Sequence, residues 1–446
     1  MSSLESAAPL APPATLSSVL RQRPFFWFTA GQTLSFFGDK LHAMALIGLT
    51  GTMQPESTPL VLAGLALLYC VPFLIVAPIA GAMVDRWNRK RTLIACDAAR
   101  AVVVALLPMA YARTGSVVLL FVFVAAVVVT TLFFNVAKMA IVPDLVAARD
   151  LVSANAVSSL LSRTASLAGI VFGGLIVGWP IWTSLGWPGY AAGFYLDAGT
   201  FVVSVATLLL MKPVSVRPTL STADRASRHG ERQPEARGRI LPWWSRAGDV
   251  ARMARADPTV LFALAASGLL GIVAGSMYVV LVLTLQTRTA WGTPGVGFVL
   301  GILAGGIIAG TAAVRALAQR WRKPDIVAAC LGVAGILLIG FALPFAFVVH
   351  GPLSFAAGMA LGPLTVTLDT ILHERVPDHV RARVFSGRDV VLNVAFGLSA
   401  AATGAVVTVL RHIGLKNPFP VVVVTLSAVV VLLSAVGARF ARRLDR

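Results

Sequence analysis

Long apolar runs, separated by short polar segments, fill most of this sequence. A run of roughly 20 apolar residues is long enough to cross a bilayer as a helix. Only 13% of the residues are charged, whereas an average soluble domain carries about 25%. The chain therefore lacks the charge that would cover a soluble surface, and we predict an all-α, polytopic membrane protein.

The apolar runs predict twelve transmembrane helices, with a polar interruption after the sixth. In the first half the predicted spans cover about 25–50, 60–84, 92–112, 116–139, 151–178 and 190–211. In the second half they cover about 258–286, 295–318, 325–349, 352–374, 384–410 and 419–440.

These spans divide the chain into two six-helix bundles, residues 25–211 and 258–440. We expect a disordered cytoplasmic tail at 1–24, a cytoplasmic linker at 212–257 and a short cytoplasmic tail at 441–446. From Trp243 onward the linker mixes apolar residues with arginine. That pattern predicts a helix lying on the membrane surface, or a plain surface helix between the halves.

The net charge of +18 comes from basic residues spread over alternate connections between spans. Basic loops mark the cytoplasmic side of a membrane protein, so both termini are expected in the cytoplasm, with the chain in a bacterial inner membrane. Because no single region gathers the charge, a nucleic-acid partner is not expected. Cys70, Cys96 and Cys330 are too few and too scattered for a metal site, and no cofactor is expected.

Two short motifs recur in the second half at the same separation. Asp85-Arg86-Trp87 is echoed by Gln319-Arg320-Trp321, and Val142-Pro143-Asp144 is echoed by Val376-Pro377-Asp378. Two echoes in one register indicate a duplicated six-helix unit. Repeats of this kind place a substrate site between the two halves.

The connection GAMVDRWNRKRTL at 81–93 carries the most specific motif, which consists of Gly81, Asp85, Arg86, Arg89, Lys90 and Arg91. With six plus six spans, this loop resembles that of the major facilitator superfamily, although Asn88 stands where the family usually has glycine. The resemblance implies two pseudo-symmetric bundles that rock about a central cavity, with the loop as a cytoplasmic gate. The alternative is that the charges only fix membrane topology.

Polar side chains inside the spans are candidates for a proton and substrate pathway, because such groups normally face a bundle interior. Asp39 is the first candidate proton carrier, and a fixed ion pair with a lysine is its alternative role. Arg163 is expected to be buried beside Asp39, Asp369 or the substrate. Asp97 and Arg100 are interpreted as a structural pair near the interface, and Asp197 receives no role. The full candidate set is Gln32, Asp39, His42, Asn135, Lys138, Arg163, Asp369 and Asn393.

Two branches of the superfamily are similar to parts of this chain. Residues 137–159 resemble exporters related to enterobactin and macrolide efflux proteins. LAGIVFGG at 167–174 is similar to the fifth-helix motif of drug–proton antiporters, with Ile170 in place of proline. Its glycines permit close helix approach and are Gly169, Gly173 and Gly174. The segment QTLSFFGDKLHAMAL at 32–46 instead resembles bacterial lysophospholipid transporters.

The function that these patterns favour is proton-coupled export of an amphipathic small molecule, such as a drug, natural product or siderophore. The alternatives are a lysophospholipid transporter of the same fold and, from another class, a non-transporting membrane scaffold. No motif of an intramembrane enzyme or of a nucleotide-binding loop is present. Membrane lipids are expected contacts, and a monomer is expected because each chain would contain its own cavity.

Overall fold

The computed structural model describes residues 16–84, 86–211, 243–288, 291–342, 347–415 and 417–443, and their regular secondary structure is entirely helical. The first half contains α1 (Leu16–Leu20), α2 (Arg23–Thr50), α3 (Thr58–Val84), α4 (Arg89–Thr114), α5 (Val117–Leu145), η1 (Ala148–Asp150), α6 (Leu151–Val177), α7 (Ile181–Ser184) and α8 (Gly189–Leu210). The second half contains α10 (Trp243–Ala256), α11 (Pro258–Arg288), α12 (Gly292–Ala318), α13 (Lys323–Ala342), α14 (Phe347–Arg375), α15 (Asp378–His412) and α16 (Phe419–Arg443).

Twelve of these helices are long enough to span a bilayer. Ten are both long and apolar enough by composition, and α2 and α3 add two more with 28 and 27 residues. The predicted fold class is therefore confirmed. One boundary was wrong: the span expected at 325–349 ends at Ala342, and the next helix already begins at Phe347.

The ends of α4 and α5 follow from local capping chemistry. The Asn88 side chain accepts a hydrogen bond from the Arg91 backbone N–H at 3.1 Å and so begins α4. Gly115 ends that helix with a φ of 60°, a conformation that glycine adopts without steric cost. Ser116 then caps α5 by accepting from the Leu119 N–H at 3.3 Å. The chain thus reverses direction within two residues.

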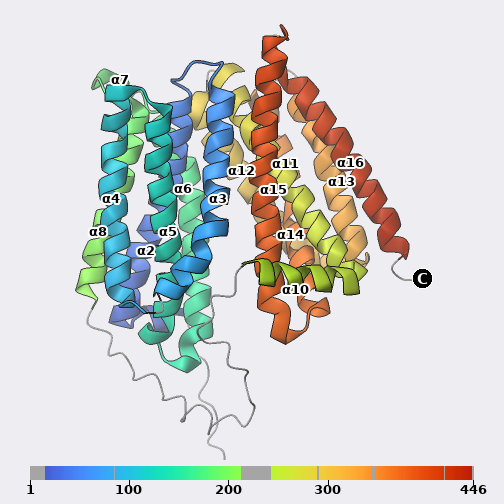
Figure 1. The fold of residues 1–446 in the computed structure, drawn as a ribbon, viewed down its shortest axis with the longest axis horizontal. Helices are drawn as coiled ribbons and strands as arrows, with labels where there is room; N and C mark the ends of the chain where they lie inside the picture. The colour runs from blue at the N-terminus through green and yellow to red at the C-terminus, as the bar shows by residue number, and fades with distance from the viewer. Residues whose placement is uncertain are drawn as a thin grey trace, which may run out of the picture.

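The long helices form two bundles of matching construction (Figure 1). In the first bundle α2 packs on α6, α3 on α5, and α4 on α8. The corresponding helices of the second bundle make the same pairs, α11 with α15, α12 with α14, and α13 with α16. The 14-residue helix α10 crosses beneath the second bundle and packs against α11 and α15. This shared pairing is what a duplicated six-helix unit predicts.

The segment expected to be a disordered tail is partly ordered. Residues 1–15 lie outside the described part of the chain, but Leu16–Leu20 forms the helix α1. Val19 is fully buried, in a cluster with Phe25 and Phe28 of α2. An apolar side chain on this short helix has a partner in the bundle, so a helix stands within the segment predicted to be a disordered tail.

The two bundles touch at the face opposite the 81–93 loop. There α6 meets α12, where a methyl group on Gly174 would lie 3.0 Å from the Cα of Gly297. On the other side of the molecule, Arg411 at the end of α15 donates a hydrogen bond to the Pro55 carbonyl at 2.6 Å. Figure 1 shows α3 and α15 diverging from this face toward the other one.

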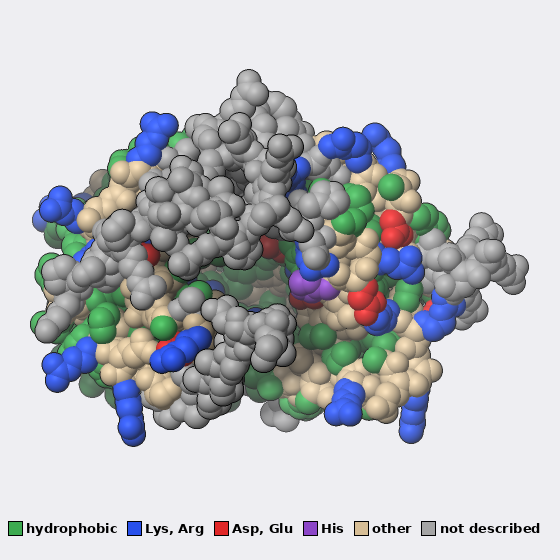
Figure 2. Space-filling view, turned by 90° about the horizontal axis from the view of Figure 1, so that it is seen from below, with side chains coloured by type: hydrophobic (Ala, Val, Ile, Leu, Met, Phe, Trp, Pro, Cys, Tyr) green, Lys and Arg blue, Asp and Glu red, His purple; other side chains and the backbone are tan. Residues whose placement is uncertain are grey.

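The face that carries the basic loops is hollowed between the two halves, and Lys and Arg side chains stand around its rim (Figure 2). The bundles are therefore closed at one face and open at the other. Gly169 and Gly173 let α6 approach α2 within its own bundle, and Gly174 lets it approach α12 of the other. The glycines at 167–174 thus permit close packing within and between the bundles.

We expect Gly297→Leu to lower the free energy of unfolding by about 1–3 kcal/mol, the usual cost of overpacking. A side chain there would lie 2.9 Å from the Ile170 carbonyl oxygen and 3.1 Å from the Gly174 Cα, and backbone atoms cannot move aside. Thermal unfolding in detergent measures the effect. Gly305→Leu on the same helix is the control, because nothing lies within 4 Å of its added Cβ. Equal losses in the two variants would contradict the proposed contact.

Candidate functional site

A central cavity of about 420 Å³ lies between the bundles. Its size falls within the range typical of small-ligand sites. α2, α3 and α5 supply most of its wall, and α11 and α15 of the second bundle complete it. Most of the lining is aliphatic. The polar and aromatic members are Asp39, Lys40, His42, Tyr69, Thr131, Tyr278 and Phe396.

Asp39 is the carboxylate of this cavity. Its side chain is 31% exposed, and its Oδ1 lies 3.7 Å from Nη1 of Arg100 on α4. Tyr69 on α3 is 47% exposed, and the rings of Tyr278 and Phe396 stand 5.9 Å apart on the opposite wall. Asp39 is therefore the one acidic residue in the lining, which also contains Lys40, His42 and Thr131 among mainly aliphatic and aromatic side chains.

Behind Asp39, Arg100 is almost completely buried, with 1% of its side chain exposed. Its guanidinium also pairs with the fully buried Asp97 one turn earlier on α4. It lies 4.3 Å from the ring centroids of both Phe134 and Phe201, which come from α5 and α8. Such contacts favour a cation over the ring face. Arg100 is thus held by groups from four helices.

Two of the buried acids of this bundle, Asp97 and Asp197, have further partners. Asp97 accepts a hydrogen bond from the Ser204 hydroxyl at 2.6 Å. Asp197, also fully buried, has its Oδ2 3.2 Å from Nδ1 of His42, which is 3% exposed. The Thr200 hydroxyl lies 3.4 Å from the other oxygen of the same carboxylate. We call Asp39, His42, Asp97, Arg100 and Asp197 the buried charge cluster.

The buried charge cluster contains more carboxyl groups than permanent cations. It holds three carboxyl groups and one permanent cation, and His42 adds a second cation only when it is protonated. Unbalanced charge in a low-dielectric interior is costly, so uptake of a proton lowers the cost. Within the described residues, no group of three or more His, Cys, Asp or Glu side chains is arranged to hold a metal ion.

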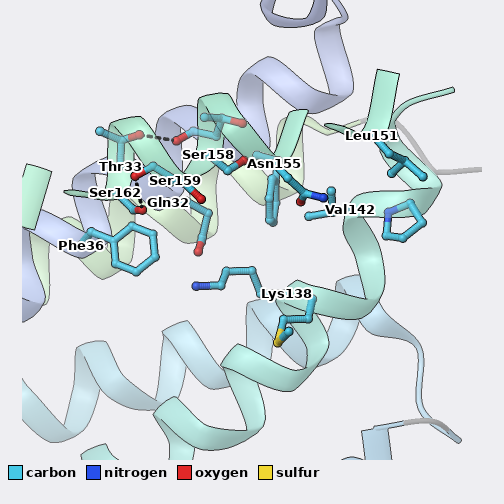
Figure 3. A pocket seen from close by; sticks show the side chains of 14 residues that line it. Gln32, Thr33, Phe36, Lys138, Val142, Leu151, Asn155, Ser158, Ser159 and Ser162 are labelled. Carbon is cyan, nitrogen blue, oxygen red and sulfur yellow. Dashed lines mark hydrogen bonds between the residues drawn. The ribbon is translucent and has the colours of Figure 1, made fainter. Parts of the chain in front are cut away.

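Other predicted pathway residues lie outside the central cavity. Gln32 and Lys138 line a second cavity of about 340 Å³ between α2, α5 and α6, as Figure 3 shows. Asn135 is half-buried on α5, one turn from Lys138. Asp39 and His42 therefore line the central cavity, Gln32 and Lys138 line the second cavity, and Asn135 lines neither.

Arg163 and its predicted partners were placed wrongly. Arg163 is exposed and makes no ion pair within the part of the chain that the structure describes. The partner of Asp39 is Arg100, and the partner of Asp369 is Arg388, with Nη1 3.2 Å from Oδ1. Asn393 is exposed and donates to the Asp389 carbonyl at 2.8 Å. The position of Arg163 along the sequence did not show which face of α6 packs against other helices.

The basic loop contacts its own bundle in this structure. Arg89 pairs with Asp144 at the end of α5, with 2.6 Å between Nη1 and Oδ2, and Lys90 donates to the carbonyl of Met211 just beyond α8. A cation at that position complements the negative end of the helix dipole. Gly81 lies in α3, Arg86 and Arg91 are exposed, and Asp85 is outside the described residues.

Sequence analysis missed the central role of Arg100. We expected Asp97 and Arg100 near the interface, and Asp197 had no assignment. Asp97 lies eight residues into α4, roughly 12 Å along the helix axis at 1.5 Å per residue, which is too deep for an interfacial position. Three acids and one arginine, placed in three predicted spans, were the available signal, because buried charges require partners.

Comparison with known proteins gives the same architecture. Residues 24–400 match the family model of the Major Facilitator Superfamily. The chain belongs to the Major Facilitator Superfamily. An uncharacterized MFS-type transporter of Mycobacterium tuberculosis is 26% identical over 405 residues, 87% of this chain and 86% of that protein. Another, from Bacillus subtilis, is 25% identical, and the match covers 43% of this chain and 42% of that relative.

Solved structures of transporters share the fold of this superfamily member. A variant of the nucleoside transporter NupG aligns with a TM-score of 0.68 at 13% identity, covering 94% of this chain and 99% of that one. A bacterial homologue of the iron transporter ferroportin, solved in an inward-facing state, gives 0.67 at 15% identity, covering 95% and 99%. These likenesses establish the twelve-helix architecture.

We expect Arg100→Met to destabilise the protein by about 3–5 kcal/mol, because it leaves buried carboxylates without a cation. Adding Asp97→Asn removes one of those carboxylates and recovers part of the loss. Thermal unfolding in detergent measures both. Arg163→Met is the control and should change stability by less than about 0.5 kcal/mol, since that side chain is exposed. A further loss in the double variant would contradict the assigned pairing.

Proposed function

We propose that this superfamily member is a proton-coupled exporter of an amphipathic small molecule. The observation that carries the proposal is the single partly exposed carboxylate, Asp39, in an apolar and aromatic cavity between the bundles. An amphipathic molecule fits such a chamber, since its apolar part contacts the aliphatic wall and its polar part meets the charged side chains of Asp39 and Lys40. The chain acts as a transporter in this account, without enzymatic chemistry.

The open face is compatible with the proposed direction of transport. That face carries the 81–93 loop and most of the basic connections, and such loops lie in the cytoplasm. We therefore propose that the protein lies in a bacterial inner membrane, with its cavity open to the cytoplasm and both termini on the cytoplasmic side. An exporter loads its substrate in this state and an importer releases it, so the open face is compatible with export, which we propose from the sequence resemblance to exporters. A monomer suffices, because one chain supplies both walls of the cavity.

The 81–93 loop is proposed to act as a gate in the outward-open state of the transport cycle. Arg89 and Lys90 bind α5 and the end of α8 here, while the open face separates the bundles. We propose that Asp85 engages the second bundle when this face closes and the cavity opens outward. The contacts of Arg89 and Lys90 support this proposal, because they hold the loop against the first bundle and do not link it to the second.

Asp39 is proposed to carry the proton because it joins the cavity to the buried charge cluster. Protonation of Asp39 removes its attraction to Arg100, and the His42–Asp197 pair offers a second place for a proton within the same bundle. Substrate and proton then compete for the same charged end of the cavity. A shared site of this kind couples the two fluxes, since each ligand lowers the affinity for the other.

The substrate is best identified by thermal unfolding of the purified protein with a panel of macrolides, cationic dyes, catecholate siderophores and lysophospholipids. A ligand that binds only the folded state stabilises it by about 2.7 kcal/mol at 100 times its dissociation constant. Stabilisation by a drug or siderophore supports export. Selective stabilisation by a lysophospholipid would favour the lipid transporter.

We expect Asp39→Asn to abolish proton movement driven by that substrate in proteoliposomes, while membrane insertion and folding persist. The amide keeps the shape of the carboxyl but cannot release a proton at neutral pH. A pH-sensitive dye inside the vesicles measures the flux.

Asp325→Asn at the start of α13 removes an equal charge away from the cavity and should leave the flux intact. Unchanged coupled flux in Asp39→Asn would overturn the proton role. Intact phenotypes in the neutral variants of Asp39, Arg163 and Asp369 together would favour a scaffold.

A further inference from the structure

The second cavity of the first bundle, which we call the α5–α6 groove, has an unusual lining. It lies where α5 and α6 separate, with α2 as its third wall. Eight of the lining side chains carry hydroxyl, amide or ammonium groups: Thr29, Gln32, Thr33, Lys138, Asn155, Ser158, Ser159 and Ser162. None of its fourteen lining residues is acidic. The groove therefore presents many donors and one positive charge.

Three of these donors have no hydrogen-bond partner among the described residues. They are the Thr29 hydroxyl, the Gln32 Nε2 and the Ser158 hydroxyl. Thr29 and Gln32 are only 3% and 5% exposed, so water does not freely replace a partner. A buried donor without an acceptor costs about 1–3 kcal/mol. All three residues line the groove, and their donor atoms lack an acceptor among the described residues.

Lys138 supplies the charge. It reaches from α5 toward the polar side chains of α2 and α6 (Figure 3). Its Nζ lies 4.3 Å from the ring centroid of Phe36, and no ion pair joins it to a carboxylate within the described residues. The acid one turn beyond Phe36 is Asp39, which Arg100 already engages. The ammonium is thus placed among donors and against an aromatic face, with no carboxylate of the described residues in ion-pair contact.

We infer that the α5–α6 groove binds a phosphate-type oxyanion, either as the headgroup of an anionic amphiphile or as a soluble phosphate. Lys138 supplies the charge, and Thr29, Gln32 and Ser158 donate hydrogen bonds to the oxygens. A phosphate group accepts several bonds at once, and lysine is a regular partner for it. A phosphate bound in the groove would bring acceptor oxygens to the residues that carry these unpaired donors.

The position of the groove admits either source. Lys138 lies seven residues before the end of α5, roughly 10 Å along the helix. This is within reach of lipid headgroups on the open face and of solutes that enter from it. The inference goes beyond the proposed export cycle, because the groove is a separate cavity from the one that Asp39 faces.

A binding measurement tests the inference. Purified protein in a non-ionic detergent is titrated with 1-acylglycerol 3-phosphate and with the 1-acylglycerol of the same chain length, which lacks the phosphate. We expect the phosphate compound to bind at least about tenfold more tightly, as charge-assisted hydrogen bonds predict. Lys138→Gln should remove that difference, and Lys138→Arg should keep most of it.

Two further arms complete the test. Lys323→Gln removes an equal charge from an exposed pair in the second bundle and should not alter binding. Displacement by inorganic phosphate or glycerol 3-phosphate shows that the groove takes the soluble anion, and failure to displace shows that the site needs the lipid chain. Equal binding of the two acyl compounds, or an unchanged preference in Lys138→Gln, would overturn the inference. Because the measurement involves no transport, it stands or fails separately from the export proposal.

Discussion

The buried guanidinium of Arg100 is the interaction on which the first bundle depends. It lies between two aromatic rings from α5 and α8 and meets carboxylates from its own helix and from α2. A charge in a bilayer interior is costly unless it is paired and satisfied. This one cation therefore fixes how four helices meet. It also holds Asp39, the one acid of the cluster that faces the central cavity, at the cavity wall.

The two bundles share their helix pairing but not their buried chemistry. At the separation given by the two echoed motifs, the second bundle has Val273 where the first has Asp39, and Leu331 and Ala334 where it has Asp97 and Arg100. All three side chains are buried and apolar. The second bundle therefore supplies an apolar and aromatic wall, whereas the first supplies the charges. The two halves thus share the helix arrangement, but the buried charges at these positions occur only in the first half.

The sequence predicted the architecture closely because a bilayer constrains it so strongly. Apolar runs must be helices of spanning length, and alternate basic loops set the two faces. The pairing of charges was harder to predict. Arg163 lies on a helix with many polar residues, yet its side chain is exposed. Asp97 and Arg100 were treated as a local pair because their spacing is local, and only the fold brings Asp39 against them.

We propose that Asp39 carries the coupling proton, and a proton carrier of this kind should shift the balance between the two states of the bundles when it is protonated. The most direct test of this proposal is a pH titration of the distances between spin labels at Val152 and Trp321, which are exposed residues of the two bundles, by double electron–electron resonance. The account predicts that the wild-type protein exchanges between a long and a short distance as the pH changes. Asp39→Asn should hold the low-pH distribution at every pH. The same pH response in the variant and in the wild-type protein would contradict the account.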